Sequence, residues 1–275
     1  MQAHQLLRRI IIATTGCLLF GIQITSVASV TSASTFDPKQ ALQTSQAAIG
    51  EPVGDYILLN TQGKPVNLSS YRGKPLVISM IYTSCYHICP TTTQHLKSVI
   101  KEAQQVLGKD SFNVITIGFD VFNDSPQAMR LFAAQQGVDM DNWTFFSIDQ
   151  PTLDQLSRDV GFLYYASPHG FDHLIQATVV DADGKVYRQV YDMKFDTPKL
   201  VEPLKELVFG TPKGGSLITH IGNRIRLFCT VYDPKSGRYI FDYSIFIGML
   251  IGLTTLGFVG FLVIKEWRKS KAGAA

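Results

Sequence analysis

Apolar residues follow three patterns along the chain, and each pattern predicts a different kind of element. Two long runs, at 10–24 and 245–264, contain no charged residue, and the second is long enough to cross the hydrocarbon core of a bilayer as a helix. Two short, almost continuous apolar runs, at 75–82 and 112–119, predict strands buried on both faces of a sheet. Between them, residues 91–107 place apolar side chains at helical spacing and predict an amphipathic helix.

Turn and capping residues mark the remaining elements. Ser125 followed by Pro126 is an N-cap with proline at the first helical position, so a helix begins there. Gly63 and Gly184 lie in turns between short strand segments and predict hairpins. The expected elements are a hairpin over 55–68, a strand over 75–82, a helix over 91–107, a strand over 112–119, a helix over 126–136, a strand over 143–146, a helix over 151–160, a loop over 161–173, a hairpin over 177–191 and a helix over 198–209. This order is that of an α/β domain with a thioredoxin-like fold and inserted elements.

Basic residues beside the two long apolar runs predict how the chain is placed in a membrane. Arg8 and Arg9 precede the first run and small residues follow it, as in a bacterial export signal; an uncleaved anchor is the alternative. A basic segment, 265–271, follows the second run, so the positive-inside rule places the C-terminus in the cytoplasm. The expected organisation is a signal peptide or anchor over 1–34, a linker over 35–50, a globular domain over 51–210, a juxtamembrane segment over 211–242, a transmembrane helix over 243–265 and a cytoplasmic basic tail over 266–275.

Charge and cysteine content narrow the function classes. The formal net charge of +3 is too small to argue for nucleic acid as a partner. Of the 4 cysteines, Cys17 lies inside the apolar core of the signal and is interpreted as incidental, which leaves Cys85, Cys89 and Cys229 exported. An odd number of exported cysteines leaves at least one outside an intramolecular disulfide. We therefore expect a globular domain with a few reactive thiols, and not a scaffold stapled by disulfides.

Two of the cysteines lie where a buried strand meets a helix. In the segment 82–90 (Tyr-Thr-Ser-Cys-Tyr-His-Ile-Cys-Pro), three residues separate Cys85 from Cys89. The free N–H groups and dipole of a helix N-terminus lower the pKa of a thiol there. A pair spaced i, i+4 puts both sulfurs on one face of a helical turn, close enough for a disulfide or for one metal ion. Two thiolates suit Cu(I), and an added imidazole completes a three-coordinate site. Two buried structural cysteines are the disfavoured alternative.

His173 is the candidate third ligand. It precedes the strand predicted from residue 177, and in a thioredoxin-like fold the loop before that strand passes beside the N-terminus of the cysteine helix. Asp172 is a candidate acceptor that would orient the imidazole. His169 competes for the ligand role, and His87, between the cysteines, is a further candidate. Because a lone histidine before a strand is usually structural, spacing alone does not decide between these roles.

Taken together, these motifs resemble the Sco/SenC family. The resemblance covers roughly residues 48–209. It rests on Gly63 with the segment 71–75 (Tyr-Arg-Gly-Lys-Pro), on the cysteine segment 82–90, and on Asp172-His173 before a Val-Val-Asp-x-x-Gly hairpin. The combination of a Cys-x-x-x-Cys-Pro motif with a distant histidine is highly specific.

The resemblance implies a fold, a cofactor and a partner. Family members have a thioredoxin-like fold, lie in bacterial or mitochondrial inner membranes, and help to assemble the dinuclear copper A site of cytochrome c oxidase. They bind a copper ion through two cysteines and a histidine, which correspond here to Cys85, Cys89 and His173. Asp120 and Asp124 resemble the family's acidic segment after the second strand.

This chain also departs from the family pattern in three places. Val121-Phe122 replaces a more usual Pro-Glu, and Tyr86-His87-Ile88 replaces a more acidic insert between the cysteines. Both changes leave the three ligands in place and bear on metal affinity or partner choice. The C-terminal span is the third departure, because familiar family members are anchored only at the N-terminus.

Three functions are compatible with these residues. A copper chaperone would hold copper on Cys85, Cys89 and His173 and deliver it to the oxidase subunit that bears the copper A site. A thiol–disulfide oxidoreductase would reduce target cysteines through Cys85 and Cys89, with no need for His173. A thiol peroxidase is suggested by Thr83-Ser84-Cys85 after a buried strand, although the nearby second cysteine fits it less well. We expect the chaperone, with associated thiol redox activity, and leave enzymatic activity open.

Partners and location follow from the same expectation. Besides the oxidase subunit, we expect a periplasmic copper donor or thiol reductant, and contact with the membrane through the C-terminal helix. The expected location is the bacterial inner membrane, with the domain on the periplasmic side. For Cys229, the candidate roles are resolving a mixed disulfide, pairing between protomers and passing copper, and a shielded free thiol is the alternative.

Overall fold

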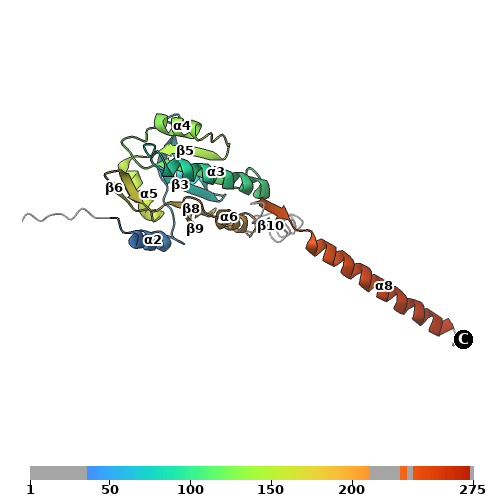
Figure 1. Cartoon of the computed structure of the whole chain (residues 1–275). Coiled ribbons are helices and arrows are strands. Elements are labelled where there is room, and N and C mark those ends of the chain that lie inside the picture. Colours follow the sequence, from blue (N-terminus) through green and yellow to red (C-terminus); the bar gives the residue numbers. More distant parts are fainter. Residues whose placement is uncertain (1–35, 211–229, 234–237, 273–275) are drawn as a thin grey trace, which may run out of the picture. The chain divides into compact units, whose positions relative to one another are not determined.

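The computed structural model describes residues 36–210, 230–233 and 238–272 (Figure 1). A seven-stranded mixed sheet runs through the globular part in the order β2-β1-β5-β4-β3-β8-β9. β3, β4 and β5 are parallel to one another, and the other neighbouring pairs are antiparallel. The strands are β1 (Ile57–Asn60), β2 (Pro65–Asn67), β3 (Leu76–Ile81), β4 (Asn113–Gly118), β5 (Trp143–Ser147), β8 (Gln176–Val180) and β9 (Val186–Tyr191).

The strands predicted from continuous apolar runs are confirmed and form the middle of the sheet. Every residue of β3 is buried, and so is every residue of β4 except the first. This burial explains why neither strand alternates between apolar and polar residues. In the parallel pair, Ile81 lies opposite Gly118. The loops that follow β3 and β4 therefore begin side by side, at the carboxyl ends of these two central strands.

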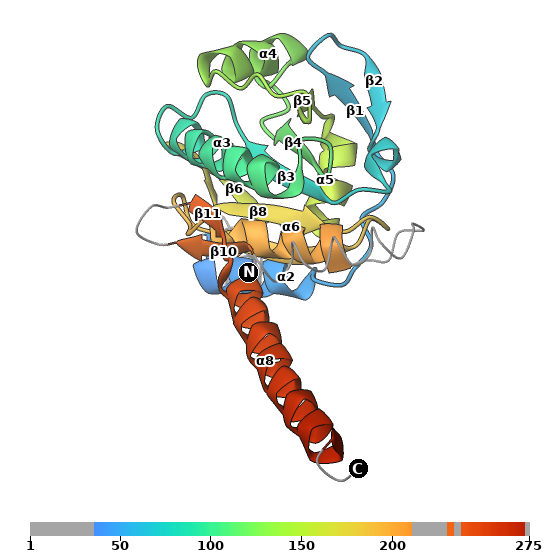
Figure 2. The same ribbon diagram turned by 90° about the vertical axis from the view of Figure 1, so that its right-hand side faces the viewer.

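Two of the predicted helices begin at side-chain caps, at or near the predicted positions. The Ser125 side chain caps α4 by accepting a hydrogen bond from Ala128 N–H at 3.3 Å, and Asp149 caps α5 through Thr152 N–H at 2.9 Å. α3 begins three residues earlier than predicted, so Cys89 lies in its first turn. The helices of the globular part are α2 (Pro38–Ala47), η1 (Leu68–Tyr71), α3 (Ile88–Leu107), α4 (Pro126–Gln135), α5 (Gln150–Asp159) and α6 (Pro198–Gly210) (Figure 2).

The segment 161–173, expected to be a loop, instead contains a second small sheet. β6 (Tyr164–Ser167) and β7 (Gly170–His173) pair as an antiparallel hairpin, with Tyr164 opposite His173. The strands are four residues each and lack a clear alternation, so local pattern gave no strand signal. Gly170 has a φ of +117°, a conformation that favours glycine and closes the turn. His173 is thus positioned by a hairpin and not by an irregular loop.

The segment 35–50, expected to be a linker, contains helix α2. Asp37 caps it by accepting from Lys39 N–H at 2.8 Å, with proline at the first helical position. Its buried side of Ala41 and Ser45 packs on the globular part, where the Ser45 hydroxyl and Tyr191 Oη lie 2.9 Å apart. Sequence composition missed this helix because most residues of the segment are polar, and its small buried side consists of Ala41 and Ser45 and gives no apolar stripe.

The C-terminal part contains a hairpin and a long apolar helix. β10 (Thr230–Asp233) pairs with β11 (Arg238–Phe241), and Tyr239 Oη donates to a Glu202 carboxylate oxygen at 2.9 Å. α8 (Ser244–Ala272) includes a 20-residue stretch with a mean hydropathy of 2.3, which is long and apolar enough to span a membrane. The predictions for 1–34, Cys17 and Cys229 lie outside the described residues.

One buried hydroxyl in α3 allows a stability prediction. Thr93 Oγ1 is buried and has no hydrogen-bond partner among the residues that the structure describes, so Thr93→Val removes an unsatisfied group without changing the side-chain shape. We expect the variant to be more stable by about 1 kcal/mol in urea unfolding. Thr178→Val is the matched control, because Thr178 Oγ1 donates to Gln189 Oε1 at 2.8 Å and its loss should destabilise the chain. A less stable Thr93→Val variant would show that this hydroxyl has a partner.

Candidate functional site

The two cysteines of the site lie one helical turn apart at the end of β3. Cys85 is in the loop that follows the strand and is 9% exposed, and Cys89 is in the first turn of α3 and is 3% exposed. Both are free thiols. The backbone N–H of Cys89 donates to Cys85 Sγ at 3.3 Å, so the start of the helix is capped by a cysteine sulfur. This confirms the predicted position of the pair at a strand-to-helix junction.

The two sulfurs differ in protonation. A hydrogen bond from the Cys89 thiol, joined by backbone N–H groups and the Tyr82 hydroxyl, lowers the pKa of the Cys85 thiol to about 4. The same hydrogen bond, together with burial, raises the pKa of the Cys89 thiol above its ordinary value. At neutral pH the pair is therefore one thiolate at Cys85 and one thiol at Cys89. Thiolate is the form that attacks disulfides and binds soft metals.

This asymmetry predicts how the thiols react with iodoacetamide. Because the pKa of Cys85 is lowered to about 4, its thiolate fraction stays near complete from pH 8 down to pH 6. We expect its alkylation rate constant to change by less than about twofold over that range. For an ordinary thiol of pKa about 8.5, the rate constant falls nearly tenfold for each pH unit below the pKa. Peptide mass spectrometry at timed quenches locates and quantifies the label. Cys89→Ala removes the thiol donor and should restore a pH dependence; a wild-type rate that falls tenfold per unit would contradict the assignment.

His173 is the last residue of β7, and its hydrogen bond defines its tautomer. Nδ1 lies 3.0 Å from the Leu174 carbonyl oxygen, which can only accept, so Nδ1 carries the proton and Nε2 has a free lone pair. Burial lowers the pKa of His173, so the imidazole is neutral at neutral pH. Asp172, the expected orienting group, is exposed; the backbone carbonyl holds the ring instead.

Aromatic rings surround the His173 imidazole. The ring centroids of Phe119 and Phe162 each lie 5.3 Å from it, and that of Tyr82 lies 6.3 Å away. The Tyr82 hydroxyl interacts with the Cys85 sulfur, and the Tyr82 ring lies edge-on to the Phe171 ring of β7, with 5.3 Å between the centroids. Tyr82 thus connects the cysteine loop with the hairpin that carries His173. Its part in the site was not predicted, because it depends on contacts between segments far apart in sequence.

Asp124 holds the cysteine loop in place. One carboxylate oxygen accepts from Thr83 N–H at 2.8 Å and from the Thr83 hydroxyl at 2.7 Å, and the other accepts from Asp120 N–H at 2.9 Å. Burial raises the pKa of Asp124. Asp120 is in turn held by Asn123, whose Nδ2 donates to it at 2.7 Å. The acidic segment noted in the sequence is therefore a support for the cysteine loop.

The two other candidate histidine ligands lie on the surface. His87, between the cysteines, and His169, in the turn between β6 and β7, are both exposed. In the part of the chain that the structure describes, no three His, Cys, Asp or Glu side chains are arranged to hold a metal ion. The structure thus brings Cys85 and Cys89 together and places His173 in the same aromatic surroundings, without a closed set of three ligands.

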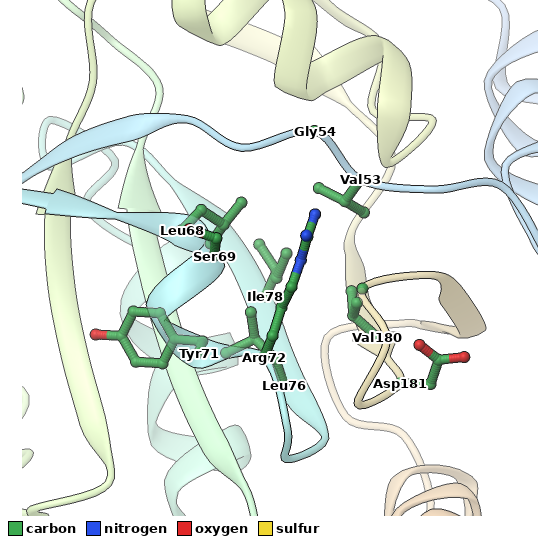
Figure 3. Close-up of a pocket in the computed structure, with 11 residues that line it drawn as sticks. Val53, Gly54, Leu68, Ser69, Tyr71, Arg72, Leu76, Ile78, Val180 and Asp181 are labelled. Carbon is green, nitrogen blue, oxygen red and sulfur yellow. The ribbon is translucent and has the colours of Figure 1, made fainter.

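A small pocket lies at the opposite end of β3 from the cysteines. It is lined by residues such as Val53, Leu76 and Val180, and Figure 3 shows the Arg72 side chain extending into it. Its volume of about 20 Å³ has room for about one water molecule. This pocket is therefore too small to hold more than about one water molecule.

Comparisons with known proteins identify the family. The SCO1/SenC family model matches residues 44–208. The SCO1 protein homolog of Bacillus subtilis (strain 168) is 30% identical over 152 residues, which are 53% of this chain and 76% of that protein. The structure of BsSco, described with a disulfide switch and as a member of the Sco family of cytochrome c oxidase assembly proteins, is 22% identical and covers 58% of this chain and 94% of its own, with a TM-score of 0.52.

The likeness to BsSco confirms the expected fold. ScoI of Bradyrhizobium japonicum, solved with copper bound, is 24% identical and covers 57% of this chain and 99% of its own, with a TM-score of 0.47. The mixed α/β architecture is the thioredoxin-like fold of Sco proteins. The matched residues 44–208 include both cysteines, the acidic turn and His173. The chain therefore belongs to the SCO1/SenC family.

Proposed function

We propose that this chain is a copper chaperone that binds Cu(I) through Cys85, Cys89 and His173 and delivers it to the copper A site of cytochrome c oxidase. The observation that carries the proposal is the chemistry of the donor set. It offers a thiolate, a thiol one helical turn away, and a neutral imidazole whose lone pair is on Nε2. Soft sulfur donors with an imidazole suit copper, whereas Mg²⁺ and Ca²⁺ prefer oxygen.

The nearby oxygen donors support the same choice of metal. Both carboxylate oxygens of Asp124 accept hydrogen bonds from the loops that they join, and one oxygen of Asp120 accepts from Asn123. These interactions direct the carboxylates toward the supporting loops. The sulfur atoms and the imidazole nitrogen are then the ligand atoms available to a metal ion. In this proposal copper is the substrate that the chain transfers, and not a permanently bound cofactor.

We further propose that α8 anchors the chain in the bacterial inner membrane, with the globular part on the periplasmic side. The apolar stretch Phe246–Lys265 and the basic residues that follow it support this orientation. Tethering raises the effective concentration of the domain near a membrane-bound oxidase subunit. A periplasmic copper donor and a thiol reductant would complete the cycle.

The second candidate function is a thiol–disulfide oxidoreductase, and the thiolate–thiol pair favours it. The Cys85 thiolate would attack a target disulfide and form a mixed disulfide. Cys89, after losing its proton, would then displace the target sulfur, so that two electrons reduce the target and the pair becomes a disulfide. This reaction makes no use of the His173 lone pair, which is the feature that separates the two functions.

Copper stoichiometry tests the proposal. The full chain is purified in detergent micelles on a Cys17→Ser/Cys229→Ser background, reduced, loaded with Cu(I) without oxygen and desalted. We expect about one copper ion per chain, none after Cys85→Ser/Cys89→Ser, and an affinity lowered by at least about tenfold after His173→Ala. His169→Ala is the matched control and should bind as the parent does.

Two results would overturn the chaperone assignment. The first is the absence of tight copper binding by the reduced parent chain. The second is copper binding that does not respond to His173→Ala. Either result would leave reduction of target disulfides by Cys85 and Cys89 as the better explanation of the site.

A further inference from the structure

Two aromatic side chains near the cysteines are almost fully exposed. Tyr86 is 94% exposed and Phe122 is 92% exposed, and the next large hydrophobic side chain of the described globular part, Ile57, is 61% exposed. An aromatic side chain can bury about 150–250 Å² in a contact, so leaving two in water forgoes a large stabilisation. Exposed apolar surface of this kind marks interaction sites.

Both side chains lie in loops at the carboxyl ends of β3 and β4, which is the end of the sheet that carries the cysteines. Tyr86 follows Cys85 directly, and Phe122 lies in the loop after β4, beside the cysteine loop that follows β3. The two loops are joined where Thr83 donates twice to Asp124. Ile88, next to Cys89, is also exposed. We call Tyr86, Ile88 and Phe122 the aromatic rim.

The loop that presents Phe122 is tightly hydrogen-bonded. The backbone N–H groups of Asn123 and Asp124 both donate to the Asp120 carbonyl oxygen, at 2.9 and 2.7 Å. The side chain of Asn123 donates to the Asp120 carboxylate at 2.7 Å. A contact residue held in this way loses little conformational freedom when a partner binds. The exposure of Phe122 is therefore part of a fixed shape.

We propose that the aromatic rim is the docking surface for the protein that accepts copper, and that this acceptor presents an apolar hollow beside its own metal-binding sulfurs. The proposal rests on the proposed function. The kind of partner is indicated by the access to Cys85. Cys85 is only 9% exposed, so a ligand atom of the acceptor protein that reaches the Cys85 sulfur must lie against Tyr86, the next residue. A membrane surface, by contrast, has no donor to exchange with the sulfurs.

The transfer that docking enables is a ligand exchange without oxidation or reduction. Bonds from copper to the chaperone's sulfur and nitrogen donors break as bonds to the acceptor's donors form, and the ion stays Cu(I). The acceptor's thiols lose their protons as they bind the ion; the vacated Cys89 takes up one proton, and any other proton goes to water. Both donor sets must touch the ion during exchange, so the rate depends on how often the two proteins meet in the correct orientation.

The test compares a variant of the aromatic rim with a control variant in which two exposed apolar side chains outside the rim are replaced by serine. Tyr86→Ser/Phe122→Ser removes the two exposed rings, and Ile57→Ser/Leu131→Ser removes exposed apolar side chains that are outside the aromatic rim. The copper-loaded full chain in micelles is mixed with the reduced, metal-free soluble copper A domain of cytochrome c oxidase subunit II from the same organism. We expect the second-order rate constant of transfer to fall at least about tenfold in the rim variant and to change less than about twofold in the control.

Copper content keeps this proposal separate from the proposed function. Neither variant replaces a copper ligand, so both should load copper as the parent does, and an unchanged transfer rate in the rim variant would overturn the docking surface. If the parent chain binds no copper, the proposed function fails. Calorimetric titration of the same soluble domain into the reduced chain then tests docking: weaker binding by the rim variant supports the surface, and equal binding overturns it.

Discussion

Asp124→Ala is expected to lower the free energy of unfolding by about 3–5 kcal/mol, because it leaves three donors in two loops, one buried and two partly buried, without an acceptor. Asp124 is 2% exposed and accepts from Thr83 N–H, the Thr83 hydroxyl and Asp120 N–H. Both loops begin at the carboxyl ends of the central strands β3 and β4. Loss of the carboxylate therefore affects the cysteine loop as well as overall stability.

Urea unfolding of the full chain in micelles, followed by circular dichroism, measures the loss. Asp124→Asn is the matched variant: its remaining carbonyl oxygen can still accept from Thr83, whereas its amide nitrogen cannot accept from Asp120 N–H. We expect an intermediate loss of about 1–3 kcal/mol for it. A loss below about 1 kcal/mol for Asp124→Ala would mean that other groups hold the cysteine loop.

Gly161→Ala is expected to release helix α2 from the globular part. A methyl group at this position would lie 2.6 Å from the Thr44 carbonyl oxygen and 2.7 Å from Ser45 Cα, and backbone atoms cannot rotate away as a side chain can. The residue also has a φ of +64°, which costs a non-glycine residue about 1–2 kcal/mol. With overpacking of about 1–3 kcal/mol added, we expect a total loss of about 2–5 kcal/mol.

Gly63→Ala separates the two causes in that prediction. Gly63 has a φ of +74°, but a methyl group there would meet no atom within 4 Å, so only the backbone cost of about 1–2 kcal/mol applies. Limited proteolysis at low protease concentration reports local release. Cleavage within 36–50 should accelerate in Gly161→Ala and stay at the parental rate in Gly63→Ala. Equal protection of α2 in both variants would contradict a close backbone contact.

The sequence was sufficient to predict the parts of the site that depend on neighbouring residues. Cys85 and Cys89 are four residues apart, so their closeness follows from one helical turn, and the apolar runs correctly predicted β3 and β4. It could not predict which cysteine holds the proton. That depends on the direction of a hydrogen bond between sulfurs and on the hydroxyl of Tyr82, whose ring packs against Phe171 of β7.

Features that rest on contacts between distant segments were missed. The β6–β7 hairpin has short strands whose stability comes from packing against the rest of the domain, as in the contact of Phe171 with Phe119 at 5.3 Å between ring centroids. Likewise, α2 looks like a spacer in sequence, and only the approach of Gly161 and the hydroxyl of Tyr191 shows that it belongs to the globular part. The pattern of a short segment does not record what the rest of the chain places against it.

Under the proposed membrane anchoring, the outermost strand β2 has a consequence for many copies of the chain in one bilayer. Molecules confined to a membrane plane collide often, and an unpaired strand edge is a template for joining one sheet to another. β2 is only three residues long, and its first residue, Pro65, has no N–H to donate. A neighbouring molecule therefore finds little backbone to pair with along this edge, which disfavours edge-to-edge aggregation even at high surface density.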